Sequence, residues 1–361
     1  MFLPELDFQL RDVFDADRLM PPDILSKVLR HLCSDGPLPL RHVLFVSKGF
    51  YNAAVNDPFL WTIISIDAEF FSHFRGRLIK QTNNFTEQCL LRSGVLPLRL
   101  CIHTSGLLDP NHLYAPLKIF RNSKYKGFER CTSLVWFNEF PNLVRRIMAL
   151  LPAELPSLQH ISLSHFRYDM GESKFPHCPL LQRAELFYCS LYSTVPWAKT
   201  FAHVTTLSIR ISTFSARYAL AVSPRLRELT ICAGSTLYLN SSLAALTLQY
   251  LRILRVRGSV FEDMLANFTA PNLEELHIEA DPDGTTAIDA LRDWRYELRC
   301  LRLYVLLPKT VRAEEPTWAT GLSEVVRKCK RLATLHISKW MEKGCKELMN
   351  NNFTHAVLHV L

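Results

Sequence analysis

The sequence predicts an α/β protein in which a short helical module precedes a solenoid with a curved parallel sheet. Three observations lead to this prediction. An apolar motif with strand-like alternation recurs eight times between residues 158 and 337. Residues 17–66 instead place apolar side chains at helical spacing, between proline and glycine breaks. The chain of 361 residues is 48% hydrophobic and 21% charged, a balance that supports a large folded core.

The recurring motif has the form Leu-x-x-Leu-x-Leu, with apolar substitutions. Its first members are 23, 23, 22, 25, 22, 25 and 34 residues apart, and all but the last spacing fall in the range of about 20–29 residues typical of leucine-rich repeats. Such repeats usually carry Asn or Cys shortly after the motif, and only Cys189 fits, so we expect an irregular leucine-rich-repeat solenoid. The eight motifs are Leu158/Ile161/Leu163, Leu181/Ala184/Leu186, Val204/Leu207/Ile209, Leu226/Leu229/Ile231, Leu251/Leu254/Val256, Leu273/Leu276/Ile278, Leu298/Leu301/Leu303 and Leu332/Leu335/Ile337.

One short strand per repeat stacks on the next in a parallel sheet, with apolar side chains inward and the alternate side chains on a concave surface. The rest of each repeat returns on the convex side as short helices or turns. We expect this solenoid over residues 67–340, with a C-terminal cap or tail over 341–361. Before residue 150 the pattern weakens, but it still predicts a helix ending at Gly94 and strands over 97–102 and 134–137.

The module at residues 17–66 has a different character, and residues 1–16 form an acidic N-terminal extension before it. Pro21 and Pro22 open a predicted helix, because proline is tolerated in a first helical turn. A break at 34–37 separates it from a second helix over 40–46, and a third helix starts near Phe50. Three short helices enclose a small core, so spare apolar surface predicts a docking site. The alternative is that this unit only caps the first repeat.

This module resembles the F-box, whose sequences read Leu-Pro-x-Glu-Ile-Leu, Val-Ser-Lys-x-Trp and Pro-x-Leu-Trp. The matching stretches are Met20-Pro21-Pro22-Asp23-Ile24-Leu25, Val46-Ser47-Lys48-Gly49-Phe50 and Asp57-Pro58-Phe59-Leu60-Trp61. Met20, Asp23 and Phe50 depart from the family pattern at three positions. With the irregular repeats that follow, most of the chain is similar to fungal-type F-box/leucine-rich-repeat proteins.

The resemblance implies a non-catalytic substrate receptor of a Skp–cullin–F-box ubiquitin ligase, in the cytoplasm, the nucleus or both. Its F-box would bind a Skp-type adaptor, and through it a cullin–RING ligase, while the repeats bind a protein target. The alternative is a leucine-rich-repeat scaffold whose F-box-like unit is only a cap. The predicted adaptor-binding and core set is Pro21, Pro22, Ile24, Leu25, Val28, Leu29, Val43, Val46, Phe50, Leu60 and Trp61.

The substrate face should follow the residue between the last two motif positions, because strand side chains alternate. This column reads Ser162, Glu185, Ser208, Thr230, Arg255, His277, Arg302 and His336, and it becomes basic from the fifth repeat onward. Guanidinium groups bind carboxylates and phosphates through paired hydrogen bonds, so Arg255, Arg257 and Arg302 form a candidate clamp for an acidic partner. The alternative is a merely solvated face. The predicted substrate-binding set is Arg255, Arg257, His277, Arg302, Tyr304 and His336.

Enzymatic, metal and cofactor functions find no support in the sequence. Phosphate-binding glycine motifs, a hydrolase nucleophile motif, His-Glu-x-x-His and Cys-x-x-Cys are all missing, so we expect no cofactor, no metal site and no catalytic residues. The ten cysteines read as small buried apolar residues in a reducing compartment.

Charge and hydropathy narrow the choice of partners. The net charge is +8, and residues 71–130 hold ten Lys or Arg against three Asp or Glu. We interpret this stretch as a solvated face and consider nucleic acid an unlikely partner, because no aromatic-interleaved binding motif accompanies it. A membrane-spanning segment or secretory leader is not expected from the apolar patterning.

Overall fold

The computed structural model describes residues 21–33, 47–67, 77–104, 111–122, 124–137, 147–165, 167–168, 175–191, 197–211, 219–233, 246–258, 268–280, 291, 298–305, 317–341 and 357–360. The chain forms two compact units, residues 1–158 and 159–361. The helical module and the first strands of the chain therefore belong to one unit, whereas the sequence suggested a boundary after residue 66. Among the described residues, no helix combines the length and apolarity that crossing a membrane requires.

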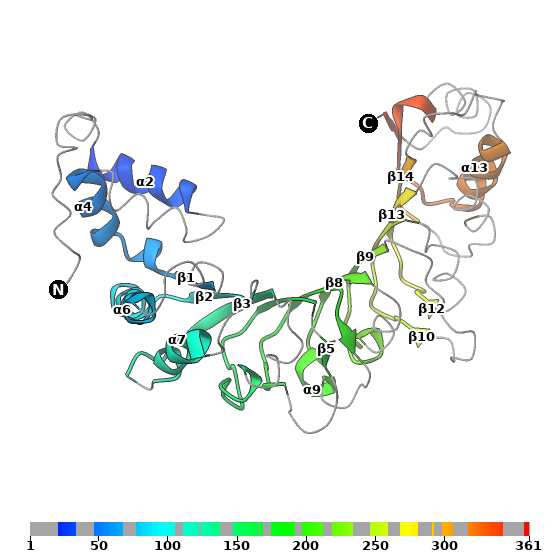
Figure 1. Cartoon of the computed structure of the whole chain (residues 1–361). Coiled ribbons are helices and arrows are strands. Elements are labelled where there is room, and N and C mark those ends of the chain that lie inside the picture. Colours follow the sequence, from blue (N-terminus) through cyan, green and yellow to red (C-terminus); the bar gives the residue numbers. More distant parts are fainter. Residues whose placement is uncertain are drawn as a thin grey trace. The chain divides into compact units, whose positions relative to one another are not determined.

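Among the described residues of the first unit, helices α2 and α4 and a 3-10 turn precede the parallel strands β1, β2 and β3, which pair in this order. Helices α2 and α4 pack against each other, and α6 packs beside α7 (Figure 1). Strand β1 begins directly after the 3-10 turn, which ties the module to these strands. The elements are α2 (Pro22–Leu32), α4 (Lys48–Asn56), η1 (Pro58–Trp61), β1 (Ile63–Asp67), α6 (Arg77–Arg92), β2 (Leu98–His103), α7 (Asn111–Arg121) and β3 (Cys131–Phe137).

Local sequence signals explain where these helices begin and end. Helix α2 starts at Pro22, whose missing N–H would have no partner in a first turn. Helix α4 is capped by Ser47, whose Oγ accepts a hydrogen bond of 3.2 Å from the Phe50 N–H. Gly94 follows α6 with a φ of 58°, the left-handed conformation expected after a helix end. The second predicted helix, over residues 40–46, lies outside the described residues.

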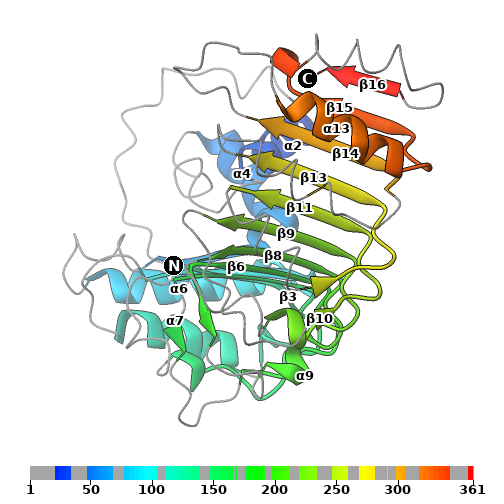
Figure 2. The same cartoon turned by 90° about the vertical axis from the view of Figure 1, so that its right-hand side faces the viewer.

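The second unit confirms the expected solenoid with a parallel sheet. Its main strands pair in the order β4-β6-β8-β9-β11-β13-β14-β15-β16, and Figure 2 shows them stacked one after another. The last strand, β16, was expected only as part of a cap or tail. The elements are β4 (His160–Ser164), β5 (Arg167–Tyr168), β6 (Arg183–Phe187), β7 (Ser190–Leu191), α9 (Ala198–Phe201), β8 (Thr206–Ile211), β9 (Glu228–Ala233), β10 (Leu246–Thr247), β11 (Ile253–Arg257), β12 (Phe268–Thr269), β13 (Glu275–Ala280), β14 (Cys300–Val305), α13 (Thr317–Lys328), β15 (Thr334–Ile337), η2 (Lys339–Met341) and β16 (Val357–Val360).

The repeated motif sets the register of this sheet. Leu254 pairs with Leu229 on one side and with Leu276 on the other, so equivalent motif positions lie side by side. The eight predicted motifs are buried, and the side chains between the last two members face the opposite side of the sheet. The returning segments cover the apolar side, where α13 buries Leu322 and Val325. The core thus runs between the sheet and the segments that return from each strand.

A backbone hydrogen-bond ladder runs along the N-terminal ends of the strands. The Thr205 carbonyl accepts bonds from the N–H groups of Arg227 and Glu228, at 2.8 and 2.9 Å. The same arrangement recurs from Gln159 to Arg299, always from one repeat to the next. Main-chain hydrogen bonds therefore fix each repeat to its neighbour at the N-terminal end of its strand.

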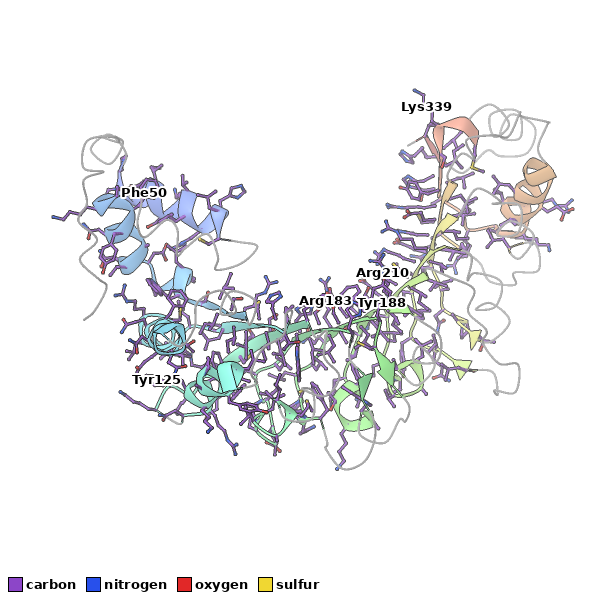
Figure 3. All side chains as sticks on the ribbon, in the orientation of Figure 1. Phe50, Tyr125, Arg183, Tyr188, Arg210 and Lys339 are labelled. Carbon is purple, nitrogen blue, oxygen red and sulfur yellow. The ribbon has the colours of Figure 1, made fainter. Side chains whose placement is uncertain are left out.

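Two residues at the C-terminal ends of strands adopt a conformation that favours glycine. His165 and Tyr188 both have a φ of 55°, and Gly258 occupies the equivalent repeat position with a φ of 94°. Left-handed backbone costs a non-glycine residue about 1–2 kcal/mol. The two rings stack with centroids 4.9 Å apart, and the Arg210 guanidinium lies 5.3 Å from the Tyr188 ring (Figure 3). These ring contacts and backbone bonds to the next strand offset the strain.

The described cysteines are free thiols, and all but Cys232 are buried. Complete burial raises the pKa of the Cys131 thiol to about 12, because a thiolate would lose its hydration there. Burial agrees with the expectation that these residues fill space in the core.

We expect Leu276→Ala to lower the free energy of unfolding by about 2–4 kcal/mol, because Leu276 is fully buried and its truncation leaves a cavity in the sheet core. Urea denaturation followed by circular dichroism measures this change. The matched control is Arg252→Ala, an exposed residue of the preceding repeat, which should shift stability by less than about 0.5 kcal/mol. Equal effects of the two substitutions would contradict the proposed core.

Candidate functional site

The first candidate surface lies on helix α2 and consists of Ile24, Val28 and Leu32. Leu25 and Leu29 are 3% and 0% exposed, so they form the buried side of the helix. Ile24, Val28 and Leu32 are 39%, 39% and 50% exposed, at the four-residue spacing that places side chains on one helix face. The apolar stripe of the sequence is thus two stripes, one buried and one open to solvent.

A buried carboxylate holds the module together beside this surface. Asp57 is 4% exposed and receives hydrogen bonds of 2.7 and 3.0 Å from the Arg30 guanidinium. The same carboxylate caps η1 by accepting a bond of 3.1 Å from the Phe59 N–H. This contact raises the pKa of Arg30, whose guanidinium also stacks on the Phe59 ring at 4.5 Å. Phe59 itself is 52% exposed and adds an aromatic side chain to the open apolar surface of the module.

Trp61 connects the module to the rest of the first unit. Its indole N–H donates a hydrogen bond of 2.8 Å to the Ala54 carbonyl, and its ring lies 6.1 Å from that of Phe85 on α6. The guanidinium of Arg92 also covers the Trp61 ring at 4.6 Å.

The structure divides the predicted adaptor-binding set, which the sequence left undivided. Four members are buried and belong to the core: Leu25, Leu29, Leu60 and Trp61. Four members are exposed: Pro21, Pro22, Ile24 and Val28. Phe50 is half-buried. Val43 and Val46 lie outside the described residues.

The second candidate surface is a row of basic side chains on five adjacent strands. Residues at the same register on β11, β13, β14, β15 and β16 face the side of the sheet opposite the core; they are Arg255, His277, Arg302, His336 and His359. Neighbouring strands lie about 4.8 Å apart, so consecutive side chains of the row touch or nearly touch. His336 and His359 stack with ring centroids 4.6 Å apart. His359 was missed in the sequence, where only the short apolar alternation around Val357 and Val360 hinted at a strand.

Carboxylates neutralise two of the three arginines of the predicted clamp. Arg255 lies 3.3 Å from Glu228, and Arg257 lies 2.5 Å from Glu279. Arg302 differs from both, because no carboxylate forms an ion pair with it among the described residues and its buried Nε has no hydrogen-bond partner there; Cys300 raises the pKa of its guanidinium, with a smaller contribution from Glu275. The buried Nδ1 of its neighbour His336 is in the same situation. Arg302 is therefore the centre of this row, and Arg255 and Arg257 are paired with acids already.

The basic neighbours disfavour protonation of the histidines in the row. The pKa of His277 is lowered by burial and by the charges of Arg302 and Arg255, against a smaller opposite effect of Glu275. The pKa of His336 is lowered by burial, by Arg302 and by His359. An anion bound between these residues would compensate the repulsion and favour the protonated histidines.

One group of possible metal ligands lies at the edge of the row. Ligand atoms of Glu275, His277 and Cys300 all lie within 4.8 Å of one another. Arg255 and Arg302 lie on either side of His277, at the same register of the neighbouring strands β11 and β14. A divalent cation would be repelled by both guanidinium groups, so the electrostatics of this cluster favour an anion over a metal.

The earlier repeats present a different surface at the same register, where Glu185 stands among Ser162, Ser208 and Thr230. Glu185 lies 3.6 Å from the His160 Nε2 and 2.6 Å from the Arg183 guanidinium. His160 and Arg183 lower the pKa of Glu185 to about 2, despite its partial burial. The basic character therefore starts at β11, as the sequence column predicted, and the preceding strands do not share it.

No protein-family model matches the chain, and no curated protein matches it. Inference about function therefore rests on the module motifs and on the two surfaces described above.

Because the native pKa of Glu185 is lowered, its ionised form stabilises the fold above the unfolded-state pKa of about 4.3, and this stability is lost as the pH falls toward about 2. We expect Glu185→Gln to lower the free energy of unfolding by about 1–2 kcal/mol at pH 7 and by less at pH 3. Urea midpoints at several pH values measure this. The control Glu129→Gln, which removes an exposed pairing with Lys126, should have little effect, and a difference between wild type and Glu185→Gln that is independent of pH would contradict the assignment.

Proposed function

We propose that the chain is the substrate-recognition subunit of a Skp–cullin–F-box ubiquitin ligase. The observation that supports it most is the exposed stripe of Ile24, Val28 and Leu32, which lies within the module that resembles the F-box, residues 17–66. Exposed apolar side chains in regular helical spacing cost solubility unless a partner covers them. A Skp-type adaptor, itself connected to a cullin–RING ligase, is the partner that the motif implies.

The module suits adaptor binding because its core and its surface use different residues. Leu25 and Leu29 hold α2 on the module, so Ile24 and Val28 can contribute to binding without supporting the fold. Binding energy in protein interfaces concentrates in a few buried anchors, and Phe59 is the largest exposed apolar side chain among the described residues of the module.

The basic row centred on Arg302 is proposed as the surface for the protein target, in a domain of the leucine-rich-repeat type. Arg302 is half-buried, and a guanidinium without a paired carboxylate can bind a carboxylate or phosphate through charge-assisted hydrogen bonds. His277 and His336 flank Arg302 and would add two further donors when protonated. An acidic or phosphorylated segment of a target is therefore the ligand that this row fits best.

In this proposal the chain binds and carries out no chemistry, and it acts in the cytoplasm, the nucleus or both. The alternative is a leucine-rich-repeat scaffold whose helical module is only a cap. The packing of Trp61 against α6 suits either function, because both require the module to be attached to its unit. The exposed stripe favours the receptor, since a cap has no need of apolar residues on its solvent side.

The double substitution Ile24→Ser/Val28→Ser should weaken binding to a recombinant Skp-type adaptor by about 30-fold or more, because two exposed apolar anchors are lost. Biolayer interferometry with the full chain measures the dissociation constant. The thermal unfolding midpoint should stay close to that of the wild type, since both residues are substantially exposed.

The matched control is Leu91→Ser/Val95→Ser, because these two apolar residues of the same unit are 48% and 91% exposed outside the module. It should leave adaptor binding unchanged. A wild-type chain that does not bind the adaptor, or a variant of the stripe that binds as tightly as the wild type, would support the scaffold instead.

The basic row predicts that anion affinity rises as the pH falls. Sulfate keeps its charge between pH 7.5 and 5.5, so any change in its affinity reports on the protein. Because burial and neighbouring cations lower the pKa values of His277 and His336, bound sulfate should raise both and bind about ten-fold more tightly at pH 5.5. Histidine ¹³C–¹H spectra recorded during sulfate titrations measure both effects.

Arg302→Gln should abolish this response, whereas Arg252→Gln, an exposed arginine at the N-terminal end of β11, should preserve it. Histidine pKa values that do not change with sulfate would contradict an anion site at this row.

A further inference from the structure

A pocket of about 880 Å³ lies at the N-terminal ends of the strands of the second unit. Its residues come from the turns that precede β6, β8, β9 and β11, and from the first positions after these turns. It therefore lies at the N-terminal ends of the strands, where the backbone ladder runs, whereas the row centred on Arg302 lies on a face of the sheet. The residues used below are Leu180, His203, Pro224, Arg225, Arg227 and Tyr250.

The apolar part of this pocket is exposed without a structural reason. Leu180 and Tyr250 are 50% and 58% exposed, and each directly precedes the first buried leucine of its repeat. The next repeat has Asn272 at this turn position, so the turn itself does not require an apolar side chain. Pro224 lies between them in the pocket wall. Exposed apolar side chains that gather in the turns before the strands indicate contact with a partner.

The charged part of the pocket is entirely basic. Arg225 and Arg227 line it together with His203, and the lining contains no carboxylate. Arg225 Nη1 lies 3.3 Å from the Nδ1 of His203, and neither arginine has an ion-pair partner among the described residues. The arginines of β11 differ in this respect, since both are paired with glutamates. The pocket therefore complements an anionic group.

The shape of the pocket favours an extended chain over a compact ligand. Its wall follows the turns before four successive strands of the sheet, which lie about 4.8 Å apart and together span about 14 Å. A peptide in extended conformation advances about 3.3 Å per residue, so about four residues would cover this length. The walls are open to solvent, as the exposure of Leu180 and Tyr250 shows, and an enclosed small molecule would find little cover here.

We propose that this pocket is a second docking site, which binds an extended protein segment combining acidic and large apolar residues. Carboxylates of the segment bind Arg225 and Arg227, and its apolar side chains pack on Leu180, Pro224 and Tyr250. This site does not depend on the helical module, on an adaptor or on the row centred on Arg302, so it can be tested separately from the proposed function.

A phage library of random 12-residue peptides, selected on the full chain, tests this proposal. The enriched peptides should combine Asp or Glu with Leu, Phe or Trp. Their affinity, measured by fluorescence anisotropy with synthetic peptides, should fall about ten-fold or more in Arg225→Glu/Arg227→Glu and also in Leu180→Ser/Tyr250→Ser. Circular dichroism should show both variants folded, because the substituted side chains lie on the surface.

The matched control is Arg299→Glu/Arg331→Glu, which reverses the charge of exposed arginines at the corresponding positions of later repeats, outside the pocket. Peptide affinity should be unchanged in this variant. Selection of no peptide, enrichment without acidic residues, or binding that survives both pocket variants would overturn the proposal. Peptides that lose affinity in Arg302→Gln instead would locate binding on the sheet face and would equally overturn it.

Discussion

The second unit depends on one repeated interaction, the pair of N–H groups that each repeat donates to a single carbonyl of the repeat before it. The carbonyls of Gln182, Thr205 and Arg227 each accept two such bonds. These bonds involve only the main chain, so they tolerate any side chain at the same positions. They hold the strands in one register although the repeats differ in length.

This register turns positions that are distant in the sequence into continuous surfaces. Arg255 and His359 are 104 positions apart, yet they belong to one row of five strands. On the opposite side of the sheet, the same register brings the motif leucines together into the core. At the N-terminal ends of the strands the register aligns the turns, so that Leu180 and Tyr250 line one pocket. Three surfaces with different chemistry therefore arise from three positions of one repeat.

Electrostatics distinguish the parts of the sheet face. Glu185 is held by His160 and Arg183, and Arg255 and Arg257 are held by Glu228 and Glu279. These pairs reduce the charge that is available to a ligand. Burial and the charge of Arg302 lower the pKa values of the two histidines beside it, and a bound anion would favour their protonated forms. Fewer basic side chains are thus available to a charged partner than the sequence of this face contains.

The sequence by itself determined the solenoid, because the motif spacing and the strand alternation depend on local composition. It also determined the start of α2 at Pro22, the helix end before Gly94 and the basic column from Arg255 onward. These features follow from backbone chemistry and periodicity, which are readable without knowledge of distant contacts.

Only the tertiary structure decided which predicted residues are available to partners. Ile24 and Leu25 are neighbours with the same chemistry, and the packing of α4 and η1 on one side of α2 buries only Leu25. Likewise, Glu228 and Arg255 meet across 27 positions because β9 and β11 are paired, and this contact gives Arg255 a carboxylate partner within the fold. His359 joins the row because the sheet continues to β16. Each of these outcomes depends on contacts between segments far apart in the chain, and single-sequence periodicity carries no information about such contacts.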